Sequence, residues 1–442
     1  MQKMKQEEQH SPAVYFKSLT IEGIHCFKSE QTIDLTDNDD NPAMWTVILG
    51  NNNTGKTTLL RCLAGFETIS ISVTPPLKHT SKLPKTHRGF HVSLKFERAY
   101  DSRSYSNTKA FAALHNFWLQ KEDAILNSTQ LKHKNLPHNT TGFYLYSSPI
   151  IYNPLLINEI LIDAYGTQRK QGKSTFIEYQ LNDRTESLFK DDIKSIINAE
   201  EWFLGTKFDA LNGDKKAQQN LTQITHTLVS ILPDITNIEI GGNGNRRVHF
   251  VTKGGERVLV NQLGSGYQSL VTWVVDFAKR MFDRYPTSDN PLAEPAIVLV
   301  DEIDLHLHPE WQRKIVSFLR DKFPKTQFIV TAHSPLVIQS SDDINVVVLQ
   351  KNEETDEVSI YQPKETNFQG WTIEEILSDL MGMGAKIRSD KYLELLSRFN
   401  EGLDEDNYQL ANIAFEELKQ ILNPQSAKLE LLKLQMASLS ND

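Results

Sequence analysis

Cysteine is nearly absent from this chain of 442 residues, which contains only Cys26 and Cys62. Two cysteines exclude a disulfide framework and are typical of a protein in a reducing compartment. No stretch reaches the roughly 18 consecutive apolar residues of a membrane span, and the first residues, MQKMKQEEQHSP, lack the apolar core of a secretion signal. No sustained heptad pattern is present, which excludes a long coiled coil. We therefore expect a cytoplasmic protein that makes no membrane contact.

The composition is otherwise that of a globular protein, with 39% hydrophobic and 23% charged residues, enough for two or three cores. The net charge of −9 is unevenly distributed: residues 351–442 hold 9 basic and 18 acidic side chains, whereas residues 78–134 hold 11 basic and 4 acidic ones. The acidic total therefore does not exclude contact of the span 78–134 with DNA or RNA. A solvated lobe rich in lysine is the alternative for this span.

Hydrophobic periodicity predicts an α/β fold. Residues 14–35 alternate as paired strands do, and the apolar run 45–50 is followed by helix-like spacing over 56–66, which is half of a βαβ unit. Helices are predicted over 108–126 and 191–211, with a strand-like break at 142–152. We expect four segments: the N-terminal part of a head domain (1–99), a mainly helical insertion lobe (100–230), the C-terminal part of the head (231–350) and an acidic helical tail for partner or subunit docking (351–442).

The segment GNNNTGKT at residues 50–57 matches the phosphate-loop pattern G-x-x-x-x-G-K-[ST] and lies between a predicted strand and a predicted helix. Backbone N–H groups of such a loop and the positive end of the following helix converge on phosphate oxygens. Lys56 adds a charge near the β- and γ-phosphates, and Thr57 offers a hydroxyl to Mg²⁺. The predicted nucleotide-binding residues here are Gly50, Asn51, Asn52, Asn53, Thr54, Gly55, Lys56, Thr57 and Thr58.

Two further apolar runs end in polar side chains that suit phosphate chemistry. AIVLVDE (296–302) delivers Asp301, which can hold Mg²⁺ together with Thr57, and Glu302, which can polarise an attacking water. TQFIVTAHS (326–334) delivers His333, which can hydrogen-bond a γ-phosphate or that water. Taken alone, each run is common in buried strands; together with the phosphate loop they predict Glu302 and His333 as catalytic residues.

These motifs resemble the ABC-type ATPases, in the branch that includes RecF, Rad50, SMC and OLD-like proteins, over about 14–66 and 235–350. The resemblance implies a head with a mixed sheet, a parallel core and an antiparallel β-subdomain, to which a helical insertion and a helical C-terminal tail are added. It also implies that ATP and Mg²⁺ are sandwiched between two subunits, so that the chain forms a homodimer or a higher homo-oligomer.

The resemblance assigns three further roles. LGSGYQS at 263–269 fits the signature loop L-S-G-G-Q, whose Ser265 and Gly266 would reach the partner subunit's γ-phosphate. Gly264 stands where the family has serine, which puts the hydroxyl contact in doubt and suggests slow turnover. Gln168 would be the nucleotide-sensing glutamine, and Asp304 would face the partner subunit.

The branch of the ABC-type ATPases that this chain resembles is indicated by the segment between the phosphate loop and the signature loop and by the tail. Gly50 and Gly266 are 216 residues apart, further than in a transporter ATPase; the gap lacks the coiled coils of Rad50, and the tail is too short for a nuclease domain of the OLD type. HLHPEWQ, VTAHSP and GWTIEEILSDLMGM resemble the ATPases of bacterial anti-phage systems, most nearly the Septu ATPases.

That resemblance implies an HNH-type nuclease partner, docked on the tail and gated by the nucleotide state, and no nuclease site in this chain. Alternatives are another defence ATPase (PARIS or OLD-like), a RecF-like DNA repair ATPase, and an ATP-binding scaffold with little hydrolysis.

Overall fold

The structure is a computed structural model, and it consists of two compact units, residues 1–371 and 372–442. The residues it describes are 14–22, 24–64, 111–114, 117–119, 129–132, 145–146, 161–169, 184–189, 196–242, 245–339, 341–352 and 354–439.

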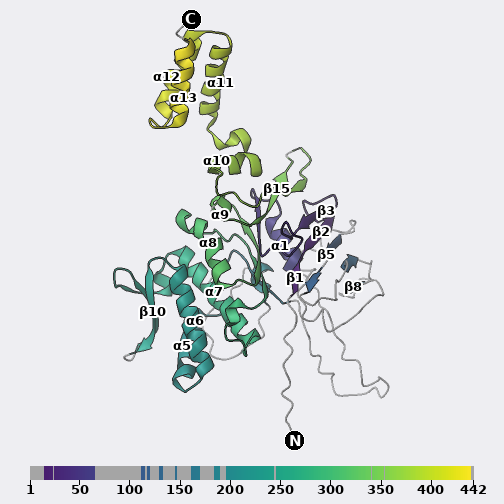
Figure 1. The fold of residues 1–442 in the computed structure, drawn as a ribbon, viewed down its shortest axis with the longest axis vertical. Coiled ribbons are helices and arrows are strands. Elements are labelled where there is room, and N and C mark those ends of the chain that lie inside the picture. Colours follow the sequence, from purple (N-terminus) through teal and green to yellow (C-terminus); the bar gives the residue numbers. More distant parts are fainter. Residues whose placement is uncertain are drawn as a thin grey trace. The chain divides into compact units, whose positions relative to one another are not determined.

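A six-stranded sheet forms the centre of the first unit (Figure 1). Its order is β16-β15-β4-β14-β13-β9, and every neighbouring pair is parallel except the edge pair β15–β16. The strands are β4 (Trp45–Gly50), β9 (Ile162–Tyr165), β13 (Ala296–Val300), β14 (Thr326–Ala332), β15 (Asn345–Lys351) and β16 (Val358–Tyr361). β4, β13 and β14 are buried along their whole length, as expected of central parallel strands covered on both faces.

Side chains that alternate along these strands build two cores. On one face, Ile48 and Ile329 pack with α1 (Lys56–Ala64) and with the antiparallel sheet that contains Leu19. On the other face, Phe328 stacks on Trp45, with ring centroids 4.4 Å apart, and contacts aromatic rings of α7 (Ser265–Arg284) and of the end of α8 (Pro309–Lys322). In Figure 1, α7 and α8 accordingly lie on the side of the sheet opposite α1.

Smaller antiparallel sheets flank this centre. One has the order β3-β2-β5-β7-β8, a second pairs β1 with β6, and the third has the order β10-β11-β12. Their strands are β1 (Val14–Phe16), β2 (Ser18–Glu22), β3 (Gln31–Asp34), β5 (Phe111–Leu114), β6 (Phe117–Leu119), β7 (Thr129–Lys132), β8 (Leu145–Tyr146), β10 (Ile235–Gly242), β11 (Asn245–Thr252) and β12 (Arg257–Leu259). The mixed sheet with a parallel core and antiparallel additions confirms the predicted fold class.

The helix predicted over 108–126 is wrong where the structure describes it. β5 and β6 occupy this part of the chain, and β5 pairs with β2, so the first part of the insertion extends the N-terminal antiparallel sheet. Apolar residues at 111, 114, 117 and 118 fit helical spacing, but pairing with a distant strand overrides such local preference.

The second part of the insertion is helical. α5 (Ala199–Leu211) begins at Asn198, whose side chain accepts a hydrogen bond from the Glu201 N–H, and α6 (Lys215–Ile231) begins at Asp214, which caps it in the same way. The remaining helical segments among the described residues of this unit are α4 (Glu186–Phe189), α9 (Leu336–Gln339) and the 3₁₀ turns η2 (Val260–Gln262) and η3 (Pro291–Ala293). None of the helices described is both long and apolar enough to cross a membrane.

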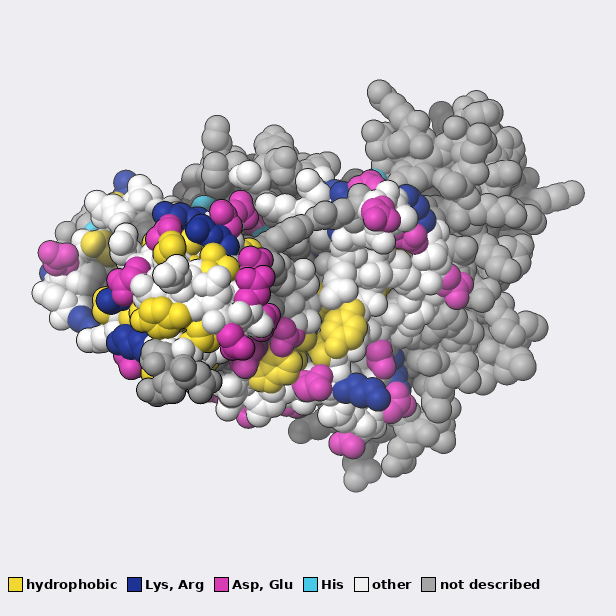
Figure 2. Space-filling view, turned by 90° about the horizontal axis from the view of Figure 1, so that it is seen from above, with side chains coloured by type: hydrophobic (Ala, Val, Ile, Leu, Met, Phe, Trp, Pro, Cys, Tyr) yellow, Lys and Arg dark blue, Asp and Glu magenta, His cyan; other side chains and the backbone are white. Residues whose placement is uncertain are grey.

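The second unit is helical, as predicted for the tail, but it begins at residue 372; the preceding β16 belongs to the six-stranded sheet. Its segments are α10 (Ile373–Glu375), η4 (Ile376–Leu380), η5 (Gly384–Ile387), α11 (Asp390–Asp404), α12 (Tyr408–Ile421) and α13 (Ala427–Leu439). Phe399, Phe415 and Leu432 form its own core. Apolar side chains are also exposed, among them Ile413 and Leu434, and Figure 2 shows such side chains interspersed with acidic and basic ones.

Candidate nucleotide-binding site

Four parallel strands end at one edge of the sheet, and the predicted site residues follow them directly. β4 ends in the phosphate loop, β13 ends before Asp301, β14 ends before His333, and β9 ends before the turn 166–169. Ligands of open α/β sheets bind outside the carboxyl ends of the strands. The sheet therefore gathers the phosphate loop, the two carboxylates and the histidine at the edge where such a ligand is expected.

The phosphate loop is shaped by a close approach at Gly55. Its φ is +88°, and an added Cβ would lie 2.7 Å from the Cys26 sulfur and 2.8 Å from the Phe27 ring. Only glycine fits this position without strain. α1 begins at Lys56, immediately after the loop, so its first N–H groups are directed to the loop. Of the other predicted loop residues, Asn51, Asn52 and Asn53 are exposed, Thr58 is half-buried and Thr54 is buried.

Lys56 lies over this loop as a buried ammonium group. Its Nζ donates hydrogen bonds of 2.8 Å to each of the carbonyls of Gly50 and Asn51. Burial lowers the pKa of Lys56, and the acidic side chains that follow β13 act in the opposite direction. A poorly solvated cation held by backbone carbonyls can exchange these partners for phosphate oxygens.

Thr57 and Asp301 meet as the predicted Mg²⁺ pair. The Thr57 hydroxyl donates a 2.8 Å hydrogen bond to Asp301 Oδ2, and the Thr331 hydroxyl donates one of 2.7 Å to Oδ1. Asp301 is buried, and its backbone N–H donates to the Tyr165 carbonyl. Mg²⁺ is commonly held by one or two protein oxygens together with phosphates and water, so a hydroxyl and a carboxylate oxygen this close fit that ion.

Glu302 and His333 are adjacent on neighbouring strand ends. Glu302 Oε1 lies 3.7 Å from His333 Nε2, and their side chains are 30% and 35% exposed. The Glu302 backbone has a φ of +48°, unusual for a residue with a Cβ, and its N–H donates to the Thr331 hydroxyl at 2.7 Å. The pair is thus fixed at the backbone and still accessible to a substrate.

The structure contradicts the outward orientation expected for Asp304. Its carboxylate is buried, and Oδ2 accepts hydrogen bonds from the backbone N–H groups of His333 and Ser334, at 3.1 and 2.8 Å. Both donors are backbone N–H groups just after β14, and hydrogen bonds to an ionised carboxylate are among the stronger ones in proteins. Asp304 therefore positions the loop of His333 within its own chain.

The signature loop packs on the segment that contains Asp304. Gly264 and Ser265 are exposed at the start of α7, whereas Gly266 is buried, and a Cβ on Gly266 would overlap the carbonyl oxygen of His306. Gly264, at the N-cap, offers the helix no side chain. Within the described part of the chain, the loop approaches the His306 backbone through Gly266 and the Trp311 ring through Tyr267.

We predict that Gly266→Ala destabilises the chain by about 1–3 kcal/mol, because the added methyl group meets backbone that cannot rotate away. Gly264→Ala is the matched control: its φ is −57°, nothing lies within 4 Å of the added Cβ, and its stability should stay within about 0.5 kcal/mol of native. Urea unfolding of both variants measures the difference, and equal stabilities would contradict the close packing at Gly266.

The turn after β9 holds two polar residues in different environments. Gln168 is exposed, so its predicted sensing role stays a prediction, whereas Arg169 is buried and donates to the backbone carbonyls of Asp301 and Glu302. Sequence reasoning missed Arg169 and Thr331. A threonine near the end of an apolar strand was a usable signal; an arginine in a polar loop was not.

The basic span 78–134 lies almost wholly outside the described residues.

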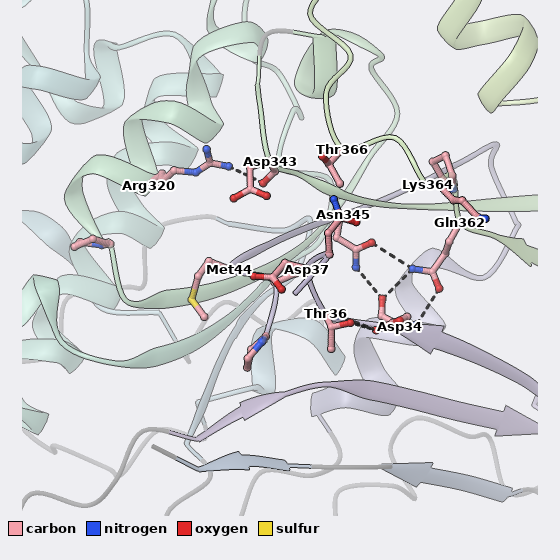
Figure 3. A pocket seen from close by; sticks show the side chains of 15 residues that line it. Asp34, Thr36, Asp37, Met44, Arg320, Asp343, Asn345, Gln362, Lys364 and Thr366 are labelled. Carbon is pink, nitrogen blue, oxygen red and sulfur yellow. Dashed lines mark hydrogen bonds between the residues drawn. The ribbon is translucent and has the colours of Figure 1, made fainter. Parts of the chain in front are cut away.

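A cavity of about 490 Å³ lies at the opposite edge of the sheet (Figure 3). Met44 and Asn345 line it where β4 and β15 begin, and Asn345 and Gln362 both donate to the Asp34 carbonyl, at 2.8 and 2.9 Å. These amides link the antiparallel sheet to the central sheet. The cavity is therefore separate from the phosphate loop, which follows the carboxyl end of β4.

Comparisons with known proteins identify relatives of this chain. Septu protein PtuA of Bacillus thuringiensis is 34% identical over 189 residues, covering 42% of this chain and 47% of that protein. The Septu protein PtuA of Bacillus mycoides is 28% identical over 363 residues, covering 80% and 43%. The Retron Ec83 probable ATPase of Escherichia coli is 30% identical over 220 residues, covering 49% and 39%. The matches thus span less than half the length of each relative.

Among solved structures, the SMC head domain from Thermotoga maritima aligns over 79% of this chain and 99% of its own, with 14% identity and a TM-score of 0.41. A family model described as AAA domain, putative AbiEii toxin, Type IV TA system matches residues 45–339. That range is more than half of the chain and contains the phosphate loop, Asp301, Glu302 and His333. The chain therefore belongs to this family of AAA domains.

Proposed function

We propose that this chain is the ATP-binding and ATP-hydrolysing subunit of a bacterial anti-phage defence complex. The observation that carries the proposal is one connected set of hydrogen bonds at the sheet edge. The hydroxyls of Thr57 and Thr331 donate to the Asp301 carboxylate, and the N–H of Glu302, beside His333, donates to the Thr331 hydroxyl. This set joins a phosphate-binding loop to a metal-binding oxygen pair and to an accessible carboxylate. The similarity to PtuA and to retron ATPases supports a role in defence.

The residues divide the chemistry among them. Lys56 and the N–H groups at the start of α1 bind the β- and γ-phosphates. Thr57 and Asp301 are the residues that would hold Mg²⁺, and Mg²⁺ bound there would neutralise charge on the phosphate oxygens. Thr331 keeps Asp301 oriented through a hydrogen bond to the carboxylate oxygen that Thr57 does not use.

Glu302 orients and polarises the attacking water, and His333 holds either that water or the γ-phosphate. Their 3.7 Å separation leaves both groups within reach of one small molecule placed between them and the phosphate loop. Because Thr331 binds both Asp301 and the Glu302 N–H, the metal-binding carboxylate and the catalytic carboxylate are held in one fixed relation.

The site is completed by a second copy of the chain. Ser265 and Gly264 are exposed at the start of the 20-residue helix α7, so the positive end of that helix is open to a γ-phosphate bound by another subunit. We propose a homodimer in which each signature loop faces the partner subunit's nucleotide.

ATP with Mg²⁺ should therefore drive association of the native chain, measured by sedimentation velocity. Ser265→Arg places a long side chain at the exposed helix start and should abolish both the ATP-dependent dimer and turnover while ATP binding persists. Ser317→Arg, at an exposed position of α8, is the matched control and should behave as the native chain does. A native chain that stays monomeric with ATP, or a Ser265→Arg variant that still dimerises, would contradict the sandwich.

We further propose that the nucleotide state gates an HNH-type nuclease partner docked on the C-terminal unit. This unit has its own hydrophobic core, an acidic excess and exposed apolar side chains such as Ile413, Leu431 and Leu434. Apolar side chains rimmed by charged ones are typical of surfaces that bind another protein. DNA cleavage by the complex should then depend on which nucleotide the ATPase holds.

A further inference from the structure

The buried arginine at the end of β9 makes contacts that the proposed chemistry has not used. β9 pairs with β13 in parallel up to Tyr165, and the Asp301 N–H donates to the Tyr165 carbonyl. In a parallel ladder the next N–H groups of β9 would bind the carbonyls that follow on β13. The turn 166–169 ends the ladder, and the Arg169 guanidinium donates to the carbonyls of Asp301 and Glu302 instead.

Arg169 thus holds the peptide groups on both sides of the Glu302 Cα. Its Nη2 is 2.7 Å from the Glu302 carbonyl oxygen and also donates to that of Asp301, while its Nε donates at 2.8 Å to the Gly166 carbonyl. One planar side chain therefore ties the start of the turn to the end of β13. A guanidinium can do this because its donors are arranged in a rigid fork.

These contacts matter because the Glu302 backbone is strained. A φ of +48° persists for a residue with a Cβ only where its surroundings hold it. Thr331 binds the N–H side of Glu302 through its hydroxyl, and the Thr331 carbonyl accepts from the Ile303 N–H. On the carbonyl side, the Glu302 oxygen accepts from the Leu305 N–H and from Arg169, which also binds the Asp301 carbonyl. Loss of Arg169 therefore removes the side-chain restraint shared by the two peptides that set the direction of the Glu302 side chain.

Arg169 stays charged in this position. Burial lowers its pKa to about 10, and the neighbouring Asp301, Asp304 and Glu302 act in the opposite direction. At neutral pH the guanidinium is therefore protonated, and its hydrogen bonds to the two carbonyls are charge-assisted.

We propose that Arg169 is a positioning residue for ATP hydrolysis, which fixes the Asp301–Glu302 backbone so that the Glu302 carboxylate meets the attacking water. The proposal rests on the hydrolytic function proposed above. It also gives the turn a mechanical role: Arg169 follows the exposed Gln168 directly, so a displacement of the turn is carried to the Glu302 peptide.

A double-mutant cycle tests this proposal in the full-length chain. Arg169→Gln should lower the single-turnover rate of ATP hydrolysis by about 10–100-fold, with the ATP Kd changed less than about threefold, because a small misplacement of a catalytic group is costly. In a Glu302→Gln background, Arg169→Gln should lower the rate further by less than about threefold, because the Glu302 carboxylate that Arg169 positions is already absent. Arg184→Gln, which removes an arginine bound to Asp163 on the same strand, is the matched control and should keep the native rate.

Arg169→Lys keeps the buried charge and a donor for the two carbonyls, so it should recover part of the lost rate. Such a recovery would show that the loss in Arg169→Gln comes from the missing donor and not from misfolding. The inference is overturned if Arg169→Gln hydrolyses ATP at the native rate, if Arg169→Lys binds ATP normally but recovers none of the lost rate, or if the loss is equally large in the native and Glu302→Gln backgrounds. A native chain whose rate does not exceed that of Glu302→Gln would refute the proposed hydrolysis itself, and this inference with it.

Discussion

Replacing Lys56 by methionine should weaken ATP binding by about 10–100-fold, the loss expected when charge-assisted hydrogen bonds to phosphate are removed. Without nucleotide, the Lys56→Met variant should unfold at the same temperature as the native chain or at a higher one. Burial lowers the pKa of Lys56, which means that burying its ammonium group costs free energy, and methionine, of similar length, does not incur this cost.

Thermal unfolding with and without ATP and Mg²⁺ separates these two effects. The native chain should gain about 2.7 kcal/mol at a ligand concentration 100 times the Kd, and Lys56→Met should lose most of this gain. Lys253→Met removes an exposed lysine, 67% accessible, from the β11 hairpin and is the control for charge alone. An ATP-dependent gain that survives in Lys56→Met would place the nucleotide elsewhere.

Glu302→Gln should lower ATP turnover by about 100–1,000-fold while ATP binding stays within about threefold of native. Glutamine has the shape of glutamate and can occupy the same backbone position, but it cannot accept a proton from the attacking water. Steady-state phosphate release and ATP-dependent stabilisation measure the two properties. Glu294→Gln, at the amino end of β13, is the control and should turn over ATP at the native rate.

The same variant tests the coupling to a nuclease, because it should accumulate the ATP-bound dimer. DNA cleavage by a complex of Glu302→Gln with its HNH-type partner should differ from that of the native complex by at least about tenfold in the presence of ATP. Equal cleavage would argue against nucleotide gating. If instead the native chain binds ATP but turns it over no faster than Glu302→Gln, the protein is an ATP-binding scaffold; the absent side chain at Gly264 points in that direction.

Local sequence motifs predicted well which residues meet at this edge of the sheet, because each part of the edge is a strand followed at once by a polar residue. The phosphate loop, Asp301, Glu302 and His333 all need only the rule that parallel strands end at a common edge. The Thr57–Asp301 contact follows from that rule although 244 residues separate the partners. The mixed sheet was predictable for the same reason, since βαβ connections force parallel neighbours.

The parts that sequence did not predict depend on contacts distant along the chain. The strands β5 and β6 form by pairing with β2 and β1, which the local pattern over 108–126 does not encode. The inward orientation of Asp304 depends on two N–H groups about 30 residues further on. Arg169 is buried where the β9 ladder stops, and it donates to the carbonyls of Asp301 and Glu302, which lie more than 130 residues further on.

The contact between Gly266 and the His306 backbone has a consequence for how two subunits would exchange information. Asp304, two residues before His306, holds the loop of His333, and Gln312 of α8 donates to the carbonyls of Asp304 and Leu307. A side chain at Gly266 would overlap the His306 carbonyl, so a shift of the start of α7 toward this segment must displace it. In the proposed dimer, the signature loop that contacts the partner subunit's nucleotide and the loop of His333 would then move together. ATP hydrolysis in one subunit would therefore depend on the nucleotide bound to the other.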